Sequence, residues 1–228
     1  MSLDCERLGG EKAVLTRVSA RGAVPFPWNA FSGIRSHGRA GKYTGPHVGR
    51  RVPQLGFGDF LTYELVDGEP RATTPTNRTR GTLQSELGSL FGNHLRANGS
   101  PCDVVTAPGV IPHLFAEHNM CVPDLGVACT PYETEQAALP EPVLLVEILS
   151  PTNQPKTWTN VWTYTSIPNV QEILVLHTNR IAAELLRRSA DGAWPERTTV
   201  ITEGELVLDS IGFRVPLAEL YARTRLAR

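Results

Sequence analysis

The sequence predicts an α/β fold, a central mixed β-sheet with helices packed on it, and three observations lead to this class. Apolar runs of strand length recur between residues 102 and 201. Two segments have the period of an amphipathic helix. The elements alternate as hairpin, helix, strands, helix and strands, and the 228 residues, 41% of them hydrophobic, suffice for one core.

The first 56 residues differ from the rest of the chain. They are rich in Gly, Pro, Arg and Ser without a sustained hydrophobic period, so we expect a disordered extension before a domain at residues 57–228. Residues 1–58 contain nine Lys or Arg against three acids, whereas the remainder has 13 against 20. A basic arm on an acidic body could contact nucleic acid, but charge without a motif is weak evidence, and a flexible tail of arbitrary composition is the favoured interpretation.

Composition also limits the partners and the compartment. No apolar run reaches the roughly 18 residues of a membrane span, and the N-terminus lacks the apolar region of a secretory signal. The four cysteines form no CxxC pair, so we expect neither a zinc site nor a disulfide framework. These features predict a cytoplasmic protein without a membrane partner.

The domain is expected to begin with a β-hairpin and a long helix. Tyr63–Ala72 contains two short strand-like runs around an Asp67-Gly68 turn, and Asn77–Asn98 has helical periodicity. Small residues nearly opposite the helix's leucines would permit close approach of another backbone, either within the chain or across a homodimer. The leucines are Leu83, Leu87, Leu90 and Leu95, and the small residues are Gly81, Ser85, Gly88 and Gly92.

Strands dominate the remainder of the chain. A second helix is predicted over Pro155–Thr165, with proline in its first turn and two tryptophans on one face. The segment "VPLAELYART" closes the chain as a helical turn or two. The predicted strands are Cys102–Ile111, Pro123–Cys129, Val143–Ser150, Glu172–His177, Ile181–Arg188 and Thr198–Ile201.

A carboxylate interrupts the most apolar of these strands. Glu147 lies between Val143–Val146 and Ile148–Leu149, and a buried carboxylate is costly unless it is paired. Asp124 opens the preceding strand, so pairing of the two strands would place both acids side by side and raise one pKa unless a cation lies between them. Mg²⁺ takes carboxylate, carbonyl and water oxygens, and the Ile148 carbonyl would add a ligand. The alternative is a turn aspartate and an ion-paired glutamate.

Five segments resemble, in order, the successive blocks of the Uma-two family, whose members are predicted endonucleases of the PD-(D/E)xK superfamily. They are "YELVDGE", "VPDLGVAC", "EPVLLVEILSPTN", "YTSIPNVQEILVL" and "LDSIGFRVPLAELY". The resemblance runs from about Tyr63 to Tyr221 and does not include the first 56 residues. It implies a restriction-endonuclease-like core, a Mg²⁺ or Mn²⁺ cofactor, and hydrolysis of phosphodiester bonds in DNA.

The resemblance also assigns roles to single residues. Pro123-Asp124 resembles the "PD" and Glu147 the second acid, while Glu64 matches an early glutamate expected near the metal. The implied protein ligands are therefore Asp124, Glu147, Glu64 and the Ile148 carbonyl. Two positions depart from the family: Asn160 occupies the place of the lysine four residues before Tyr164, and Arg80 occupies the place of a histidine.

Lys156 is our hypothesis for the missing lysine. It lies one helical turn before Asn160, on the stripe that also contains Tyr164, so it could reach the site from one turn away. A solvated lysine at a helix start is the alternative. With Asn160 at the lysine position, the rival function is a catalytically impaired member that serves as a nucleic-acid-binding or dimerisation module. A hydrolase of another phosphoester is a third hypothesis.

Overall fold

The computed structural model describes residues 63–72, 77–113, 116, 119–131 and 138–227. The extension predicted at residues 1–56 lies outside this part, and its disorder stays a prediction. Within the described residues, no helix has both the length and the apolar character that crossing a membrane requires.

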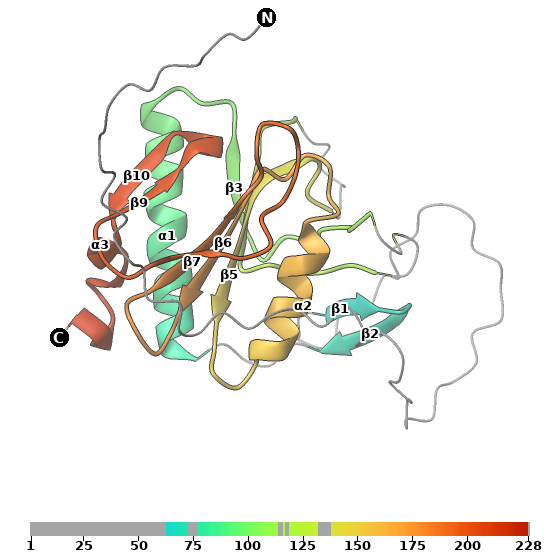
Figure 1. Ribbon diagram of the computed structural model, residues 1–228, viewed down its shortest axis with the longest axis horizontal. Coiled ribbons are helices and arrows are strands. Elements are labelled where there is room, and N and C mark those ends of the chain that lie inside the picture. Colours follow the sequence, from blue (N-terminus) through green and yellow to red (C-terminus); the bar gives the residue numbers. More distant parts are fainter. Residues whose placement is uncertain (1–62, 73–76, 114–115, 117–118, 132–137, 228) are drawn as a thin grey trace, which may run out of the picture. The chain divides into compact units, whose positions relative to one another are not determined.

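A mixed six-stranded sheet forms the centre of the domain and confirms the predicted α/β class (Figure 1). The strands lie in the order β3-β4-β5-β6-β7-β8, and β5 runs parallel to β6 while the other neighbours are antiparallel. Helix α2 (Gln154–Tyr164) connects the parallel pair. The strand bounds are β3 Asp103–Thr106, β4 Leu125–Ala128, β5 Pro142–Leu149, β6 Glu172–His177, β7 Ala183–Arg187 and β8 Thr199–Ile201.

The two faces of β5 belong to two different cores, which explains its long apolar run. Leu144, Val146 and Ile148 pack in the cluster that contains the buried face of α1 (Arg78–Ala97). Leu145 and Leu149 pack in the cluster that contains α2. Because side chains alternate along a strand, Glu147 projects to the α2 face between them.

The predicted hairpin is present as β1 (Tyr63–Val66) and β2 (Glu69–Ala72). Its turn residues Asp67 and Gly68 have φ of 54° and 80°, the left-handed conformation that a tight two-residue hairpin turn demands. Leu65 exchanges two backbone hydrogen bonds with Met120, at 2.9 and 3.0 Å. This bridge attaches β1 close to the start of β4 and thereby positions Glu64.

A C-terminal hairpin was not predicted from the sequence. Strands β9 (Glu205–Leu208) and β10 (Phe213–Pro216) pair with each other, and the short helix α3 (Leu217–Tyr221) follows. Two single 3₁₀ turns, Asp209–Ile211 and Arg225–Ala227, complete this region. In both strands buried residues alternate with less buried ones, but each strand is only four residues long, too short for a clear period of two in the sequence. The hairpin packs on α1, where the rings of Phe91 and Phe213 meet edge to face at 4.9 Å.

The third strand is shorter than predicted. The sequence indicated Cys102–Ile111, whereas β3 ends at Thr106 because Ala107 adopts a φ of 49°, outside the extended region. The Ala107 N–H instead donates to the Asp124 carbonyl at 3.0 Å. The strand thus turns away where the candidate site begins.

The small-residue stripe of α1 packs within the chain. A Cβ at Gly88 would lie 3.6 Å from Leu125, and one at Gly92 would lie 3.7 Å from Val104. These are ordinary van der Waals distances, so a Cβ would fit at both positions and the close approach does not depend on glycine. Both positions face β3 and β4 of the same chain, and the homodimer stays a prediction.

The expectation that disulfides are absent is wrong. Cys102 and Cys129 are bonded to each other, and they directly flank the paired residues Asp103 and Ala128 on β3 and β4. Their separation of 27 residues gave no local signal, since the strand register alone brings them together. The cysteine argument for the cytoplasm therefore fails, and the cytoplasmic location stays a prediction.

Replacing both Cys102 and Cys129 with serine is expected to lower the free energy of unfolding by about 2–4 kcal/mol, because the cross-link restricts the unfolded chain. Urea unfolding of the oxidised protein and of the double variant measures the difference. Thiol titration of the unfolded, unreduced wild type is the control. Reaction at either position would contradict the bond.

Candidate functional site

The predicted site residues Glu64, Asp124, Glu147, Lys156 and Asn160 line one cavity of about 190 Å³, and Ile148 is not among its lining residues. Three buried acids, Glu64, Asp124 and Glu147, contribute its carboxyl groups, and each is less than 5% exposed. Its cationic side chains are Arg80 and Lys156. The remaining lining residues are Gln84, Thr106, Ala107, Val122, Pro123, Asn153, Thr157 and Asn160.

Asp124 lies immediately before β4 and is held by both its carboxylate and its backbone. Arg80 donates to the two carboxylate oxygens in a fork, from Nε to Oδ1 at 2.7 Å and from Nη2 to Oδ2 at 2.9 Å. The backbone N–H of Ile148 donates to Oδ2 at 2.7 Å. Gln84 donates to the Asp124 carbonyl at 2.7 Å. These bonds fix the orientation of the carboxylate toward β5.

Glu147 lies on β5 one step beyond the pair Leu125–Val146, so continuing the register places it opposite Asp124. The Tyr164 hydroxyl donates to its Oε1 at 2.7 Å. Burial, followed by the charge of Asp124, raises the pKa of Glu147 to about 8. At neutral pH the metal-free site therefore holds Glu147 mostly in its neutral form.

Asp124 has more hydrogen-bond donors around its carboxylate than Glu147 has. Burial raises its pKa, and the hydrogen bonds and charge of Arg80, together with the Ile148 N–H, oppose the rise. A carboxylate that accepts from a guanidinium fork and a backbone amide favours the ionised form. Glu147, by contrast, accepts its hydrogen bond from a neutral hydroxyl.

The register explains why the Ile148 carbonyl is available. The β4–β5 pairing ends at Leu125–Val146, and Pro123, two residues before Leu125, has no N–H to donate. In an antiparallel pair, the N–H and C=O of one residue face the same neighbouring strand. Because the Ile148 N–H donates to Asp124, its carbonyl is directed to the same side. Pro123 thereby removes the ladder donor that would otherwise occupy this oxygen.

Glu64 reaches the cavity from β1 and meets α2. Asn160 donates to Oε1 at 3.3 Å, a long hydrogen bond, and the Lys156 ammonium forms an ion pair with Oε2. Lys156 Nζ is close enough to Oε2 for an ion pair, but the contact does not have the angles of a hydrogen bond. The stripe predicted on α2 is thus divided: Lys156 and Asn160 contact Glu64, and Tyr164 contacts Glu147.

The donor set fits a hard divalent cation by type, since its groups are carboxylate and carbonyl oxygens. Burial, followed by the charge of Asp124, raises the pKa of Glu147. Within the described ranges, however, no three His, Cys, Asp or Glu side chains are grouped as a metal site would group them. Arg80 holds Asp124, and Lys156 holds Glu64. Ligation therefore requires these side chains to rearrange.

Two residues of the site carry contacts that the sequence did not predict. Arg80 was singled out only as a departure from the family histidine, and its fork on Asp124 was missed. Gln84 was missed altogether, although it lies one helical turn after Arg80 on α1, a spacing that places both on one face.

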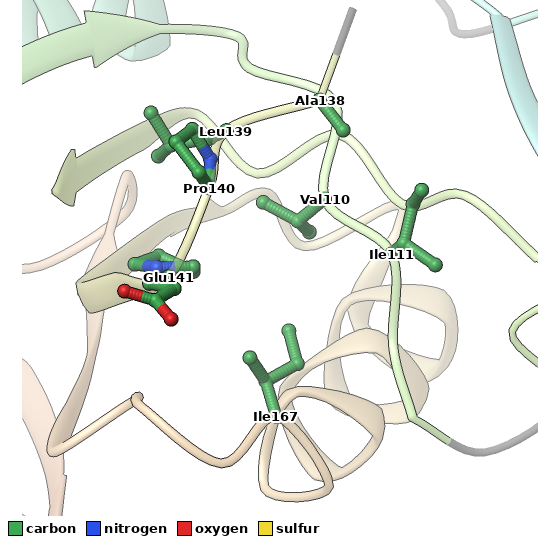
Figure 2. A pocket seen from close by; sticks show the side chains of 8 residues that line it. Val110, Ile111, Ala138, Leu139, Pro140, Glu141 and Ile167 are labelled. Carbon is green, nitrogen blue, oxygen red and sulfur yellow. The ribbon is translucent and has the colours of Figure 1, made fainter. Parts of the chain in front are cut away.

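A second cavity, of about 230 Å³, has a different character (Figure 2). Its lining is mainly aliphatic, and Figure 2 shows the Glu141 carboxylate as the charged group beside Val110, Leu139 and Ile167. Thr130 already donates to Glu141 at 2.8 Å. Without converging polar groups, this cavity offers no comparable chemistry.

Two comparisons with known proteins found a match, one with a family model and one with solved structures. The model of the Uma2 family, described as "Putative restriction endonuclease", matches residues 52–218. Among solved structures, a similar one is the "Crystal structure of a putative nuclease belonging to DUF820 from Anabaena variabilis ATCC 29413". That likeness has 16% sequence identity and a TM-score of 0.58, covers 71% of this chain and 90% of the other, and shows the fold alone. Among curated proteins, none matches this chain.

Proposed function

The chain belongs to the Uma2 family, and from this premise we propose that it is a Mg²⁺- or Mn²⁺-dependent endonuclease that hydrolyses phosphodiester bonds in DNA. The observation that carries the proposal is the opposed pair of buried acids, Asp124 and Glu147, at the wall of one cavity. Such a pair is costly unless positive charge compensates it. Arg80 holds Asp124, whereas Glu147 accepts its hydrogen bond from the neutral Tyr164 hydroxyl.

Several groups of this chain would hold the metal ion or orient its ligands. Asp124, Glu147 and the Ile148 carbonyl are the proposed ligands, with Glu64 assisting from β1. Tyr164 orients Glu147 through its hydroxyl, and Pro123 leaves the Ile148 carbonyl free of the ladder. When bound, a divalent ion supplies Lewis-acid stabilisation of the phosphate and lowers the pKa of the attacking water.

Lys156 is proposed to act on the phosphate. Its side chain lines the cavity and is 37% exposed, so the ammonium can meet an incoming anion. A fixed cation stabilises negative charge that develops on the phosphate oxygens, and it positions the water for attack. Asn160 holds Glu64 by a hydrogen bond and supplies no charge of its own.

Plasmid nicking tests the proposal. We expect wild-type protein to nick supercoiled DNA with Mg²⁺ or Mn²⁺ and to be inactive in EDTA. Asp124→Asn and Glu147→Gln keep the shape of each side chain and remove its charge, and we expect each to lower cleavage by at least about 100-fold. The proposal is refuted if wild-type protein does not nick the plasmid, or if both variants cut it as well as wild type does.

The rival function has its own supporting observations. Asn160 provides no cation at the position of the family lysine, and the Arg80 fork already neutralises Asp124. A non-catalytic DNA-binding module would bind DNA in EDTA, and its binding would be unchanged in Asp124→Asn. Filter binding carried out beside the nicking assay distinguishes the two functions.

A further inference from the structure

We propose that Arg80 is a cationic lock on the candidate metal site: its guanidinium occupies Asp124 until a divalent ion displaces it. The inference rests on the proposed function, because it presupposes that Asp124 ligates a metal. It goes beyond that function by assigning Arg80 a role in setting how tightly the site binds the ion.

The lock follows first from the lone pairs of Asp124. A carboxylate has about four lone-pair positions for acceptor contacts. Arg80 Nε, Arg80 Nη2 and the Ile148 N–H already occupy three of them. A metal ligand needs a lone pair directed at the ion from about 2 Å, and these contacts leave one, on Oδ1, beside the guanidinium itself. A divalent ion and the guanidinium therefore compete for the same carboxylate.

Electrostatic repulsion between the guanidinium and a divalent ion also opposes binding of the ion. Arg80 is positively charged at every relevant pH, and the charge of Asp124 raises its pKa further, against the effect of burial. With the guanidinium in place, a divalent ion would enter a site where Asp124 is already neutralised and a cation lies within contact distance. Both effects lower the affinity of the site for the ion.

Arg80 is also placed so that it can move. Its backbone is fixed in the first turn of α1, where its N–H donates to Asn77 Oδ1 at 2.9 Å. Its side chain is 23% exposed and lines the cavity, so rotation about the side-chain bonds can carry the guanidinium off Asp124 without moving the helix. The released cation stays beside the cavity in which a phosphate would bind.

Calorimetric titration of Mn²⁺ into the full-length protein tests the lock. Arg80→Gln removes the charge, and we expect it to bind Mn²⁺ about 10- to 100-fold more tightly than wild type, the range that one charge-assisted contact spans. Arg80→Lys keeps the charge but loses the fork, and we expect an intermediate affinity. Arg78→Gln is the matched control, since Arg78 is an exposed arginine in the same helical turn, and its affinity should equal that of wild type.

The outcomes separate the lock from the metal site. If wild type binds Mn²⁺ and Arg80→Gln binds it no more tightly, the lock is refuted and the metal site stands. If neither protein binds Mn²⁺, the metal site fails and the lock with it. If Arg80→Gln does not fold, two other measurements decide the question: the Mn²⁺ affinity of Arg80→Lys and the NMR resonance of the Arg80 Nε–H in wild type. That resonance must shift as Mg²⁺ saturates the site, and an unchanged resonance would refute the lock.

Discussion

Replacing Lys156 with alanine is expected to lower the rate of DNA cleavage by about 100-fold, the usual effect of removing one fixed group that stabilises the transition state. The ammonium reaches the cavity from the first turn of α2 and pairs with Glu64 there, beside the acids proposed to hold the metal. Single-turnover nicking at saturating Mg²⁺ measures the loss, because it reports the chemical step rather than binding.

Two further variants separate catalysis by Lys156 from simple neutralisation of Glu64. Asn160→Lys places an ammonium one turn along the same helix face, and we expect it to restore part of the cleavage in the Lys156→Ala background. Gln154→Ala, at an exposed position at the start of α2, should change nothing. The hypothesis fails if Lys156→Ala loses no cleavage while Asn160→Lys alone gains it.

The elements that could be predicted from the sequence have strong local signals. The Asp67-Gly68 turn is specific to a tight hairpin, and the apolar run of β5 is typical of a strand buried on both faces. The pairing of Asp124 with Glu147 needed one additional assumption, that β4 and β5 are neighbours, and the sheet confirms it. From that point the register alone brings the two acids together.

The contacts that could not be predicted depend on residues far apart in the chain. Arg80 and Asp124 are 44 residues apart, and nothing local to either predicts a fork between them. The same holds for Cys102 and Cys129, which meet only because β3 and β4 pair in one register. The missed hairpin of β9 and β10 is a different case, since its alternation was visible but spans only four residues in each strand.

Replacing Glu147 with glutamine is expected to stabilise the metal-free protein at pH 8. The carboxyl has an ordinary pKa of 4.5, and burial with the charge of Asp124 raises the pKa to about 8 in the fold. The folded state therefore binds more protons than the unfolded state between these values, and the free energy of unfolding falls as pH rises from about 4.5 to 8. Glutamine keeps the acceptor for Tyr164 and does not titrate, so the variant lacks this decline.

The gain should be on the order of a few kcal/mol at pH 8, since one pKa unit corresponds to about 1.4 kcal/mol. Urea unfolding of both proteins between pH 5 and 8.5 (about the range that the two pKa values bracket) measures it. Glu172→Gln is the matched control. Glu172 is also buried but accepts from Arg187 and Ser210, so losing its charge should destabilise the fold.

Adding Mn²⁺ is expected to reverse the order of stability. A ligand that binds only the folded state raises its stability by RT ln(1 + [L]/Kd), so wild type should gain stability as Mn²⁺ is added while Glu147→Gln should not. If Glu147→Gln is less stable than wild type at pH 8 without metal, groups of the fold itself must stabilise the Glu147 carboxylate. The argument that this acid is kept for a cation would then fail. If Glu147→Gln is instead more stable than wild type without metal and does not respond to Mn²⁺, then Glu147 lowers the stability of the fold until the ion binds.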